Sequence, residues 1–322
     1  MKKKKRLKLK KKVYYFGAFI VFLIVGILLG INYYNDYQYK QTNEYKLLEK
    51  GYSLEDTKTI FAKLSETEQQ KLIDNDKDDK IISLLEQKYF LEKNLEDYKE
   101  YINKNNETDY AKVISIVNVH ANHKWYQLEL NTNKDLGMLM NVNKFYTLSE
   151  TYTPENLKNI DLTYAYDEEG KNKLIDYAYD KFLELWQAAN DQGFYLMVTS
   201  SYRDYESQKE IYDYRVSTWG ERKADETAAR PGHSEHQTGL VIDMTSKTEP
   251  LADSFTDSKA YEWLKENAYK YGFIERYPEG KTYLTGYNPE SWHWRYVGLE
   301  AAKTMHDEDI TFDEYYAFYV EK

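Results

Sequence analysis

The order of apolar and polar positions divides the chain into stretches of different character. Residues 13–35 carry no charged side chain and are rich in Ile, Leu, Val and Phe. Residues 36–112 are polar, rich in lysine and glutamate, and free of proline. From residue 113 onward, short apolar runs alternate with amphipathic stretches. The pattern predicts a membrane helix, then a helical segment, then a folded domain over residues 113–322.

The apolar segment is long enough to cross a bilayer, since about 20 apolar residues suffice for a helix. A cleaved signal peptide would have a shorter apolar core and a small-residue cleavage site. The segment instead runs into Asn32-Tyr33-Tyr34-Asn35-Asp36, without an A-x-A pattern, and the absence of cysteine excludes a lipoprotein anchor. We therefore expect an uncleaved transmembrane signal anchor at 13–35. The basic tail at 1–12 should remain cytoplasmic, which places the rest outside the membrane.

The polar segment at 36–112 contains a loose internal repeat. Leu47-Leu48-Glu49-Lys50-Gly51-Tyr52 recurs as Leu84-Leu85-Glu86-Gln87-Lys88-Tyr89, and an amphipathic pattern follows each copy. Ser53 with Asp56 three residues later is typical of a helix N-terminus. We expect two related helical hairpins. They form either a stalk that docks a partner or a solvated spacer, and the sequence identifies no protein partner.

The remainder predicts helices interleaved with short strands. Strands are expected at 114–117, 125–130, 194–198, 240–244 and 292–297, and helices at 171–190, 204–219 and 260–271. In the first of these helices Leu174, Ala178, Phe182, Leu185 and Ala189 share one face. Elements of both kinds, with polar residues at strand ends, are typical of a compact α+β domain.

Charge and cysteine content narrow the function classes. Nine of the 44 basic residues lie in residues 1–12, so the remainder carries 35 basic against 54 acidic residues. An acidic body argues against a nucleic-acid partner. With no cysteine in the chain, a disulfide framework and a thiol nucleophile are both excluded.

Three short stretches carry candidate chemistry. They are Ser200-Ser201-Tyr202-Arg203, the ten residues from Ser234 to Asp243, and Glu290-Ser291-Trp292-His293. Together they offer histidines and an aspartate as metal ligands, a further carboxylate and an arginine. Two imidazoles and one carboxylate around zinc leave a coordination position open, and a nearby carboxylate can act as general base. A guanidinium suits an oxyanion or a substrate carboxylate.

Each candidate has a structural alternative. Asp243 ends an apolar run and needs a partner if buried, which a cation, a cap or an ion pair would supply equally well. His233 competes with His236 as a ligand, and His293 can instead belong to an aromatic cluster. Glu290 favours the metal site for His293, but the two share a pocket only if Glu290 lies on a turn or bulge. Arg203 can equally form a surface ion pair, and His120 and His123 are expected in a loop.

These motifs resemble the VanY-type D-alanyl-D-alanine carboxypeptidases, zinc peptidases of the bacterial cell wall. The family pattern S-x-H-x-x-G-x-x-x-D is met by Ser234, His236, Gly239 and Asp243. The stretch from Ser200 to Arg203, followed by Gln208, resembles the upstream element, and Glu290, Trp292 and His293 match E-x-W-H. The similarity covers about residues 140–300. Ser291 stands where proline is usual, and Val241 where a smaller residue is common.

The resemblance implies a zinc-peptidase domain with a small antiparallel sheet and flanking helices. It implies zinc ligands His236, Asp243 and His293, with Glu290 as catalytic base. It further implies that Arg203 stabilises the tetrahedral intermediate or orients substrate. The implied substrate contacts are Tyr202, Gln208 and Ser234.

The expected function is removal of a C-terminal D-alanine from peptidoglycan stem peptides by a D,D-carboxypeptidase at the cell membrane. L,D-carboxypeptidase action on tetrapeptide stems is a close alternative, because no residue decides between them. The alternative from another class is a non-catalytic protein that binds or scaffolds the cell wall. A serine hydrolase is disfavoured, because the chain contains no G-x-S-x-G sequence.

Overall fold

The computed structural model describes residues 2–166, 170–250 and 252–321. The chain divides into two compact units, Met1–Glu92 and Lys93–Lys322. The second unit therefore includes residues 93–112, which the sequence analysis places with the preceding helical segment. It also contains every candidate site residue.

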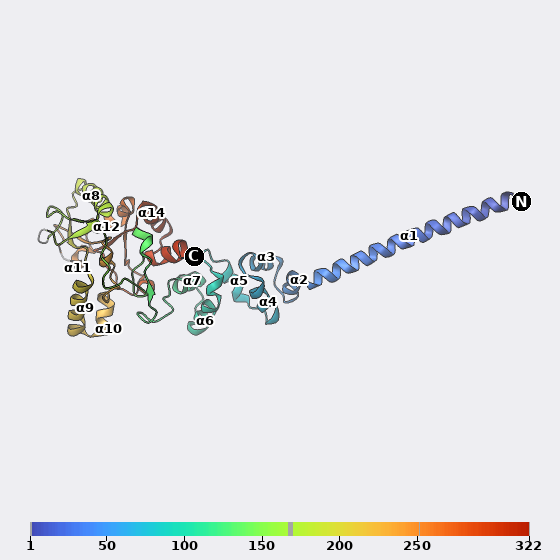
Figure 1. Ribbon diagram of the computed structural model, residues 1–322, viewed down its shortest axis with the longest axis horizontal. Coiled ribbons are helices and arrows are strands. Elements are labelled where there is room, and N and C mark those ends of the chain that lie inside the picture. The colour runs from blue at the N-terminus through green and yellow to red at the C-terminus, as the bar shows by residue number, and fades with distance from the viewer. Residues whose placement is uncertain (1, 167–169, 251, 322) are drawn as a thin grey trace. The chain divides into compact units, whose positions relative to one another are not determined.

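The first unit is helical in its described part. Its elements are α1 (Lys2–Gln41), α2 (Asn43–Glu49), α3 (Leu54–Lys63), α4 (Glu66–Asp74) and α5 (Asp79–Leu85). The single long helix α1 contains the apolar segment (Figure 1). Residues 10–41 of this helix are long and apolar enough to cross a membrane, and none of their apolar window is buried within the protein.

Side-chain caps set the boundaries of the short helices after α1. Ser53 accepts a hydrogen bond from the Asp56 backbone, and Asp56 accepts one from the Ser53 backbone, which confirms the predicted cap of α3. Leu47 and Leu84, at equivalent positions in the two repeat copies, are buried close to the C-terminal ends of α2 and α5. The segment is thus built from short capped helices around a small apolar core.

The second unit mixes helices with short strands. Its helices of four or more residues, apart from 3₁₀ segments, are α6 (Leu95–Asn105), α7 (Tyr110–Asn118), α8 (Asp176–Asp191), α9 (Tyr205–Trp219), α10 (Glu221–Thr227), α11 (Ala252–Phe255), α12 (Lys259–Asn267), α13 (Thr282–Thr285), α14 (Leu299–Glu308), α15 (Phe312–Tyr315) and the π-helical η5 (Tyr316–Val320). The 3₁₀ segments are η1 (Glu92–Asn94), η2 (Lys134–Leu139), η3 (Glu235–Thr238) and η4 (Ala268–Tyr271); η1 begins at the last residue of the first unit. The strands are β1 (Leu130–Asn131), β2 (Tyr146–Thr147), β3 (Leu157–Asn159), β4 (Lys173–Ile175), β5 (Leu196–Ser200), β6 (Val241–Ser246), β7 (Phe273–Glu275) and β8 (His293–Tyr296).

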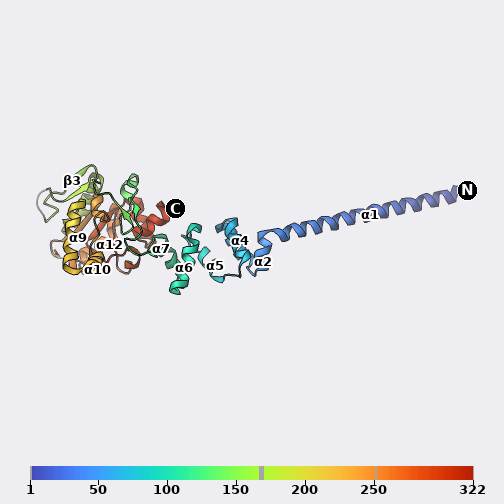
Figure 2. The ribbon, with the colours of Figure 1, turned by 60° about the horizontal axis from the view of Figure 1, so that its bottom comes forward.

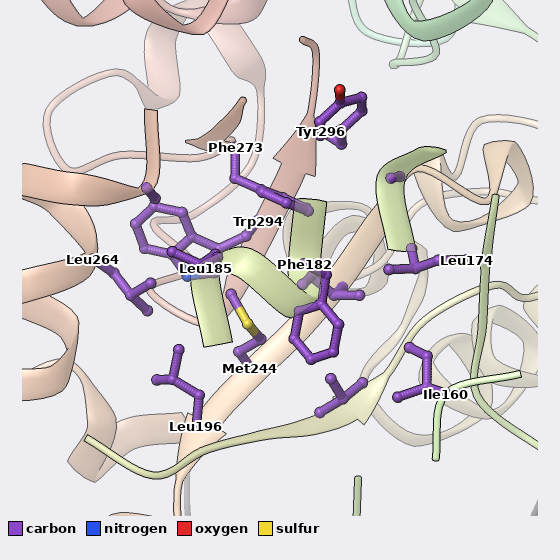
Figure 3. Close-up of a cluster of buried hydrophobic side chains, with 14 of the residues drawn as sticks. Ile160, Leu174, Phe182, Leu185, Leu196, Met244, Leu264, Phe273, Trp294 and Tyr296 are labelled. Atoms are coloured by element: carbon purple, nitrogen blue, oxygen red, sulfur yellow. The ribbon is translucent and has the colours of Figure 1, made fainter. Parts of the chain in front are cut away.

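A four-stranded antiparallel sheet lies at the centre of this unit, in the order β5-β6-β8-β7. Its apolar side chains pack with those of α8 and α12 in one cluster, part of which Figure 3 shows. Ile242 and Met244 of β6 and Trp294 of β8 belong to this cluster. Because side chains alternate along a strand, Asp243 and His293 project from the opposite face. The sheet therefore separates an apolar core from a polar face.

The structure corrects three of the predicted elements. Residues 114–117 lie in helix α7, because Val113, Ile116 and Val117 recur at helical spacing and are buried. Their β-branched side chains favoured a strand, but tertiary burial decides between the two. Only Leu130 of the strand expected at 125–130 is in a strand. Helix α8 begins at Asp176, so Leu174 reaches the same core from β4.

The other predicted elements are present with small shifts of their ends. Strands β5, β6 and β8 and helices α9 and α12 lie where the sequence places them. Helices α9 and α10 lie next to each other in both views of the ribbon (Figures 1 and 2). The fold is the predicted α+β class, with a small antiparallel sheet and flanking helices.

Candidate active site

Two histidines and one aspartate converge on the polar face of the sheet. His236 lies in η3, Asp243 in β6 and His293 in β8, and all three are buried. One ligand atom from each lies within 4.8 Å of the other two. His236 Nε2 is 3.5 Å from Asp243 Oδ2, and His293 Nδ1 is 3.2 Å from Asp243 Oδ1. We name these three residues the ligand trio.

Local backbone structure explains how the trio forms. In the antiparallel pairing of β6 with β8, Asp243 lies directly opposite His293. Gly239 ends η3 with a φ of 68° and turns the chain into β6. A Cβ atom at Gly239 would approach Leu157 Cδ2 to 2.9 Å, so a side chain is disfavoured by crowding as well as by conformation. This turn carries His236 back over the strand that holds Asp243.

A hydrogen bond orients the His236 imidazole, and two nearby carboxylates flank the His293 imidazole. His236 Nδ1 lies 2.6 Å from the Ser201 carbonyl oxygen and donates to it, which leaves Nε2 free to face Asp243. His293 presents Nδ1 to Asp243, while its Nε2 lies 3.6 Å from Glu235 Oε2. Metal-binding histidines commonly have an oxygen partner at the second ring nitrogen. The trio thus directs two ring nitrogens and a carboxylate towards one point.

The protonation states follow from burial and neighbouring charge. Burial lowers the pKa of His236 to about 3, which keeps the imidazole neutral and able to act as a ligand. Burial opposes ionisation of Asp243 as well, but the two histidines lower its pKa to about 2. Burial also disfavours charge on His293, but the neighbouring carboxylates of Asp243 and Glu235 raise its pKa to about 9. A cation at the trio would replace that proton.

The donor set fits a divalent metal ion such as zinc. Within the described residues, the buried atoms Asp243 Oδ1 and His293 Nε2 have no hydrogen-bond partner. Buried polar atoms without a partner are costly, so the concentration of such atoms at the trio requires an explanation. A cation held by two imidazoles and one carboxylate gives Asp243 its missing partner and matches zinc's preferred ligands.

Glu290 lies on a turn beside the trio. The His293 backbone donates to the Glu290 carbonyl oxygen over 3.1 Å, which brings the two side chains to the same side despite their spacing of three residues. Glu290 Oε2 is 3.6 Å from His293 Nδ1. Burial raises the pKa of Glu290 to about 7, in the range that suits a group that takes and returns a proton. The turn that the sequence analysis requires is therefore present.

Arg203 and Gln208 form the adjoining wall. Arg203 Nη1 donates to Gln208 Oε1 over 2.8 Å, and Gln208 Nε2 donates to the Ala229 carbonyl oxygen. Burial lowers the pKa of Arg203, but Asp243 and Glu290 counteract this effect. The Arg203 Nε atom is buried and, in the described part of the chain, has no hydrogen-bond partner. This guanidinium is thus available to a substrate oxygen.

The site opens into a cavity of about 750 Å³. Its lining includes the ligand trio, Arg203, Gln208, Ser234 and Glu290. Tyr202 is only partly buried and does not belong to the residues that line it. His233 is held by the Asn143 carbonyl oxygen at 2.7 Å and also lies outside the lining. His120 and His123 follow α7 in a turn. The structure thus separates His236 from the competing histidines.

Sequence reasoning missed Glu235. Its Oε1 accepts hydrogen bonds from Arg276 Nε at 2.8 Å and Arg295 Nη1 at 3.0 Å, all in the fully buried interior. Burial opposes its ionisation, but the two guanidiniums hold the pKa of Glu235 well below its usual range. Arg276 also pairs with Asp313 of α15. Arg295 within β8 and Arg276 directly after β7 were the signal in the sequence, because two cations next to buried strand residues call for an internal acid.

The chain is similar to proteins of known family. The family model described as VanY, D-alanyl-D-alanine carboxypeptidase, matches residues 171–299, a range that contains the trio, Arg203 and Glu290. The "Putative carboxypeptidase YodJ" of Bacillus subtilis is 43% identical over 183 residues, which are 56% of this chain and 67% of that protein. A "D-alanyl-D-alanine carboxypeptidase" of Enterococcus faecalis is 39% identical over 153 residues, 44% of this chain and 55% of that protein.

A solved structure agrees with this assignment. The chain matches the structure described as "LdcB LD-carboxypeptidase", with "peptidoglycan recognition" in the same description, at 40% identity and a TM-score of 0.56. The match covers 59% of this chain and 90% of that one. The structural match and the sequence matches both identify carboxypeptidases. The chain therefore belongs to the VanY family of D-alanyl-D-alanine carboxypeptidases, and it is a carboxypeptidase of the bacterial cell wall.

Proposed function

We propose that the protein is a zinc-dependent D,D-carboxypeptidase that removes the C-terminal D-alanine from peptidoglycan stem peptides. The observation that carries this proposal is the convergence of His236, Asp243 and His293 beside Glu290 and Arg203 in one cavity. A peptidase that binds a chain end needs a group for the terminal carboxylate and a group that moves a proton, and both lie next to the trio.

In this proposal His236, His293 and Asp243 would hold the ion, through the ring nitrogens and the carboxylate that face one another. Bound zinc supplies Lewis acidity towards the scissile carbonyl and towards water. The neutral state of His236 and the ionised state of Asp243 suit this role without any further proton release. Glu235 and the Ser201 carbonyl oxygen hold the imidazoles in orientation from behind.

Glu290 takes a proton from water and returns it to the leaving amine. A carboxyl group with a pKa of about 7 is present in both protonation states near neutral pH, so it can do both steps. Arg203 binds the terminal carboxylate or the developing oxyanion, and its hydrogen bond to Gln208 fixes the guanidinium plane. Ser234, buried in the cavity wall, is a further substrate contact.

The linkage that is cleaved defines a second candidate function. Removal of D-alanine from a D-Ala-D-Ala terminus is supported by the E. faecalis relative, which is called a D-alanyl-D-alanine carboxypeptidase. L,D-carboxypeptidase action on tetrapeptide stems is supported by the 40% identity to a structure described as an LD-carboxypeptidase. The two activities use the same ligand trio and differ in the residue that precedes the scissile bond.

We propose that the first unit anchors this activity at the cell surface. Helix α1 is long and apolar enough to anchor the chain in the cytoplasmic membrane, with the basic residues 1–12 on the inside. The second unit, which carries the cavity, would then face the peptidoglycan. The membrane and the stem peptide are the partners that this arrangement implies.

Mass spectrometry of stem peptides treated with the purified full chain in detergent tests the proposal. The pentapeptide L-Ala-γ-D-Glu-L-Lys-D-Ala-D-Ala and the corresponding tetrapeptide are incubated with zinc, and in parallel with a chelator. We expect loss of one alanine from the pentapeptide, abolished by the chelator and restored by added zinc. Cleavage of the tetrapeptide alone would replace the D,D assignment with L,D, and chelator-resistant cleavage would contradict zinc dependence.

A further inference from the structure

The active-site cavity extends along one face of α9, well beyond the trio. Gln208, Ile211, Arg215 and Trp219 recur every three or four residues and all line the cavity. With a rise of 1.5 Å per residue, Arg215 lies about 10 Å along the helix axis from Gln208, and Trp219 lies about 16 Å from it. The groove is thus much longer than a single terminal alanine.

Arg215 carries a charge without an ion-pair partner into this groove, where it acts on Glu290 only at longer range by opposing the rise of that carboxyl's pKa. Its guanidinium carbon lies 4.7 Å from the centroid of the Trp219 ring, so the two side chains stack. Over residues 2–166, 170–250 and 252–321, no carboxylate forms an ion pair with Arg215 and no acceptor takes a hydrogen bond from it. Arg222, on α10 outside the cavity, is by contrast paired with Glu226 at 3.0 Å.

Stacking prepares Arg215 for a planar anion. Contact with the indole face restrains the guanidinium plane but uses none of its N–H donors, which remain directed outward along the edge. A guanidinium with free donors in a fork matches a carboxylate with two parallel hydrogen bonds. Glu210 also lines the cavity, but it lies five residues earlier on α9, is exposed, and is not paired with Arg215.

We propose that Arg215, backed by Trp219, forms a subsite for a second carboxylate of the substrate, separate from the terminal carboxylate at Arg203. The inference rests on the proposed function. An extended peptide advances about 3.3–3.6 Å per residue, so the axial separation from Gln208 to Arg215 corresponds to about three residues. In a pentapeptide stem, the α-carboxylate of the γ-linked D-glutamate lies three residues before the terminal D-alanine.

Paired peptides test the subsite. The pentapeptide with D-glutamate is compared with its isoglutamine analogue, in which an α-carboxamide replaces the α-carboxylate. We expect the wild-type chain to prefer the carboxylate peptide roughly tenfold in kcat/KM, from a charge-assisted hydrogen bond. Arg215→Gln should reduce this preference to about one, whereas the control Arg222→Gln should keep it. Equal preference in wild type and Arg215→Gln would overturn the subsite.

A binding measurement separates the subsite from the proposed activity. Titration calorimetry of the Glu290→Gln chain with both peptides reads affinity without turnover. The carboxylate peptide should bind roughly tenfold more tightly, and the additional substitution Arg215→Gln should remove the difference. If the wild type cleaves neither peptide while this difference persists, the proposed function fails and the subsite stands. If both peptides bind Glu290→Gln equally, the subsite fails regardless of turnover.

Discussion

At the site, the two histidines of the ligand trio present different ring nitrogens to Asp243. His236 donates from Nδ1 to a backbone carbonyl and offers Nε2, whereas His293 turns Nε2 towards Glu235 and offers Nδ1. The residue behind each ring decides which nitrogen is free for a ligand. The orientation of the two histidines therefore depends on Ser201 and Glu235, which are not themselves members of the ligand trio.

Replacement of Glu290 separates proton transfer from metal binding. Glu290→Gln keeps the size of the side chain but cannot accept a proton, so kcat should fall by a factor of about 10² to 10⁴. Bound zinc should stay at the wild-type level, because the trio is intact. Metal content by mass spectrometry and the rate of alanine release give the two readings. Glu206→Gln, an exposed change on α9 outside the cavity, is the control. Near-normal turnover in Glu290→Gln would show that the proton is moved elsewhere.

Replacement of Glu235 probes the support of the trio. Glu235→Gln removes the carboxylate that faces His293 Nε2, and we expect zinc affinity to fall by about 10- to 100-fold. Competition with a chromophoric chelator measures this affinity. Asp313→Asn is the matched control, because it breaks the other ion pair of Arg276, whereas the described carboxylates paired with His293 are Glu235, Asp243 and Glu290. Equal losses of affinity in both variants would indicate a general destabilisation instead of a specific effect on His293.

At the level of elements, the turn between η3 and β6 sets the position of His236. Gly239→Ala would place a methyl group within 3.2 Å of Pro154, Leu157 and Ile175 in a left-handed conformation. Gly280 has a similar positive φ of 78°, but nothing lies within 4 Å of an added Cβ. We expect Gly239→Ala to lower the free energy of unfolding by about 1–3 kcal/mol more than Gly280→Ala, because only the former overpacks its site. Denaturant titrations compare them, and equal losses would exclude overpacking.

Helices α9 and α10, which line the outer groove, are joined through Asp225. Its carboxylate accepts hydrogen bonds from Tyr212 of α9 and from two nitrogens of Arg230. Burial opposes ionisation, but Arg230 and Tyr212 hold the pKa of Asp225 below its usual 3.8. The folded state therefore binds this proton less readily than the unfolded state, and the stabilisation is complete above about pH 4 and lost at lower pH.

The substitution Asp225→Asn tests that pH dependence. We expect a loss of about 2 kcal/mol in the free energy of unfolding at pH 7, from charge-assisted hydrogen bonds, and a smaller difference from wild type as the pH falls below about 4. Tryptophan fluorescence reports this unit alone, since all six tryptophans lie beyond residue 92. The control is Asp213→Asn, whose partner Lys209 is exposed on the same helix and should contribute less than about 0.5 kcal/mol. A difference that grows in acid would contradict the sign.

On the scale of the whole molecule, the chain combines a membrane-compatible helix with a separate unit that carries the site. The absence of cysteine makes the proposed orientation directly testable, because single introduced cysteines have no background. In intact cells, a membrane-impermeant maleimide should label Lys63→Cys, an exposed position beyond α1. It should label Lys4→Cys only after the membrane is permeabilised. Labelling of Lys4→Cys in intact cells would reverse the proposed orientation.

Local sequence patterns were sufficient to predict those elements whose structure depends on neighbouring residues in the chain. The apolar run predicts the long helix α1, Ser53 and Asp56 predict the cap of α3, and the periodicity of residues 204–219 predicts α9. The ordered motifs also predict the family, and they nominate His236, Asp243, His293 and Glu290, which the structure brings into one cavity. These features depend on spacing along the chain, which the sequence states directly.

Only the tertiary structure revealed the features that depend on contacts between residues distant in sequence. Burial turned the β-branched run at 114–117 into helix α7, and the pairing of β6 with β8 brought Asp243 opposite His293. The buried acid Glu235 and the groove along α9 up to Arg215 likewise depend on packing. Sequence by itself determined the chemical groups and the elements that carry them. Only the folded chain decided which groups face one another, because hydrogen-bond partners and desolvation are properties of three-dimensional proximity.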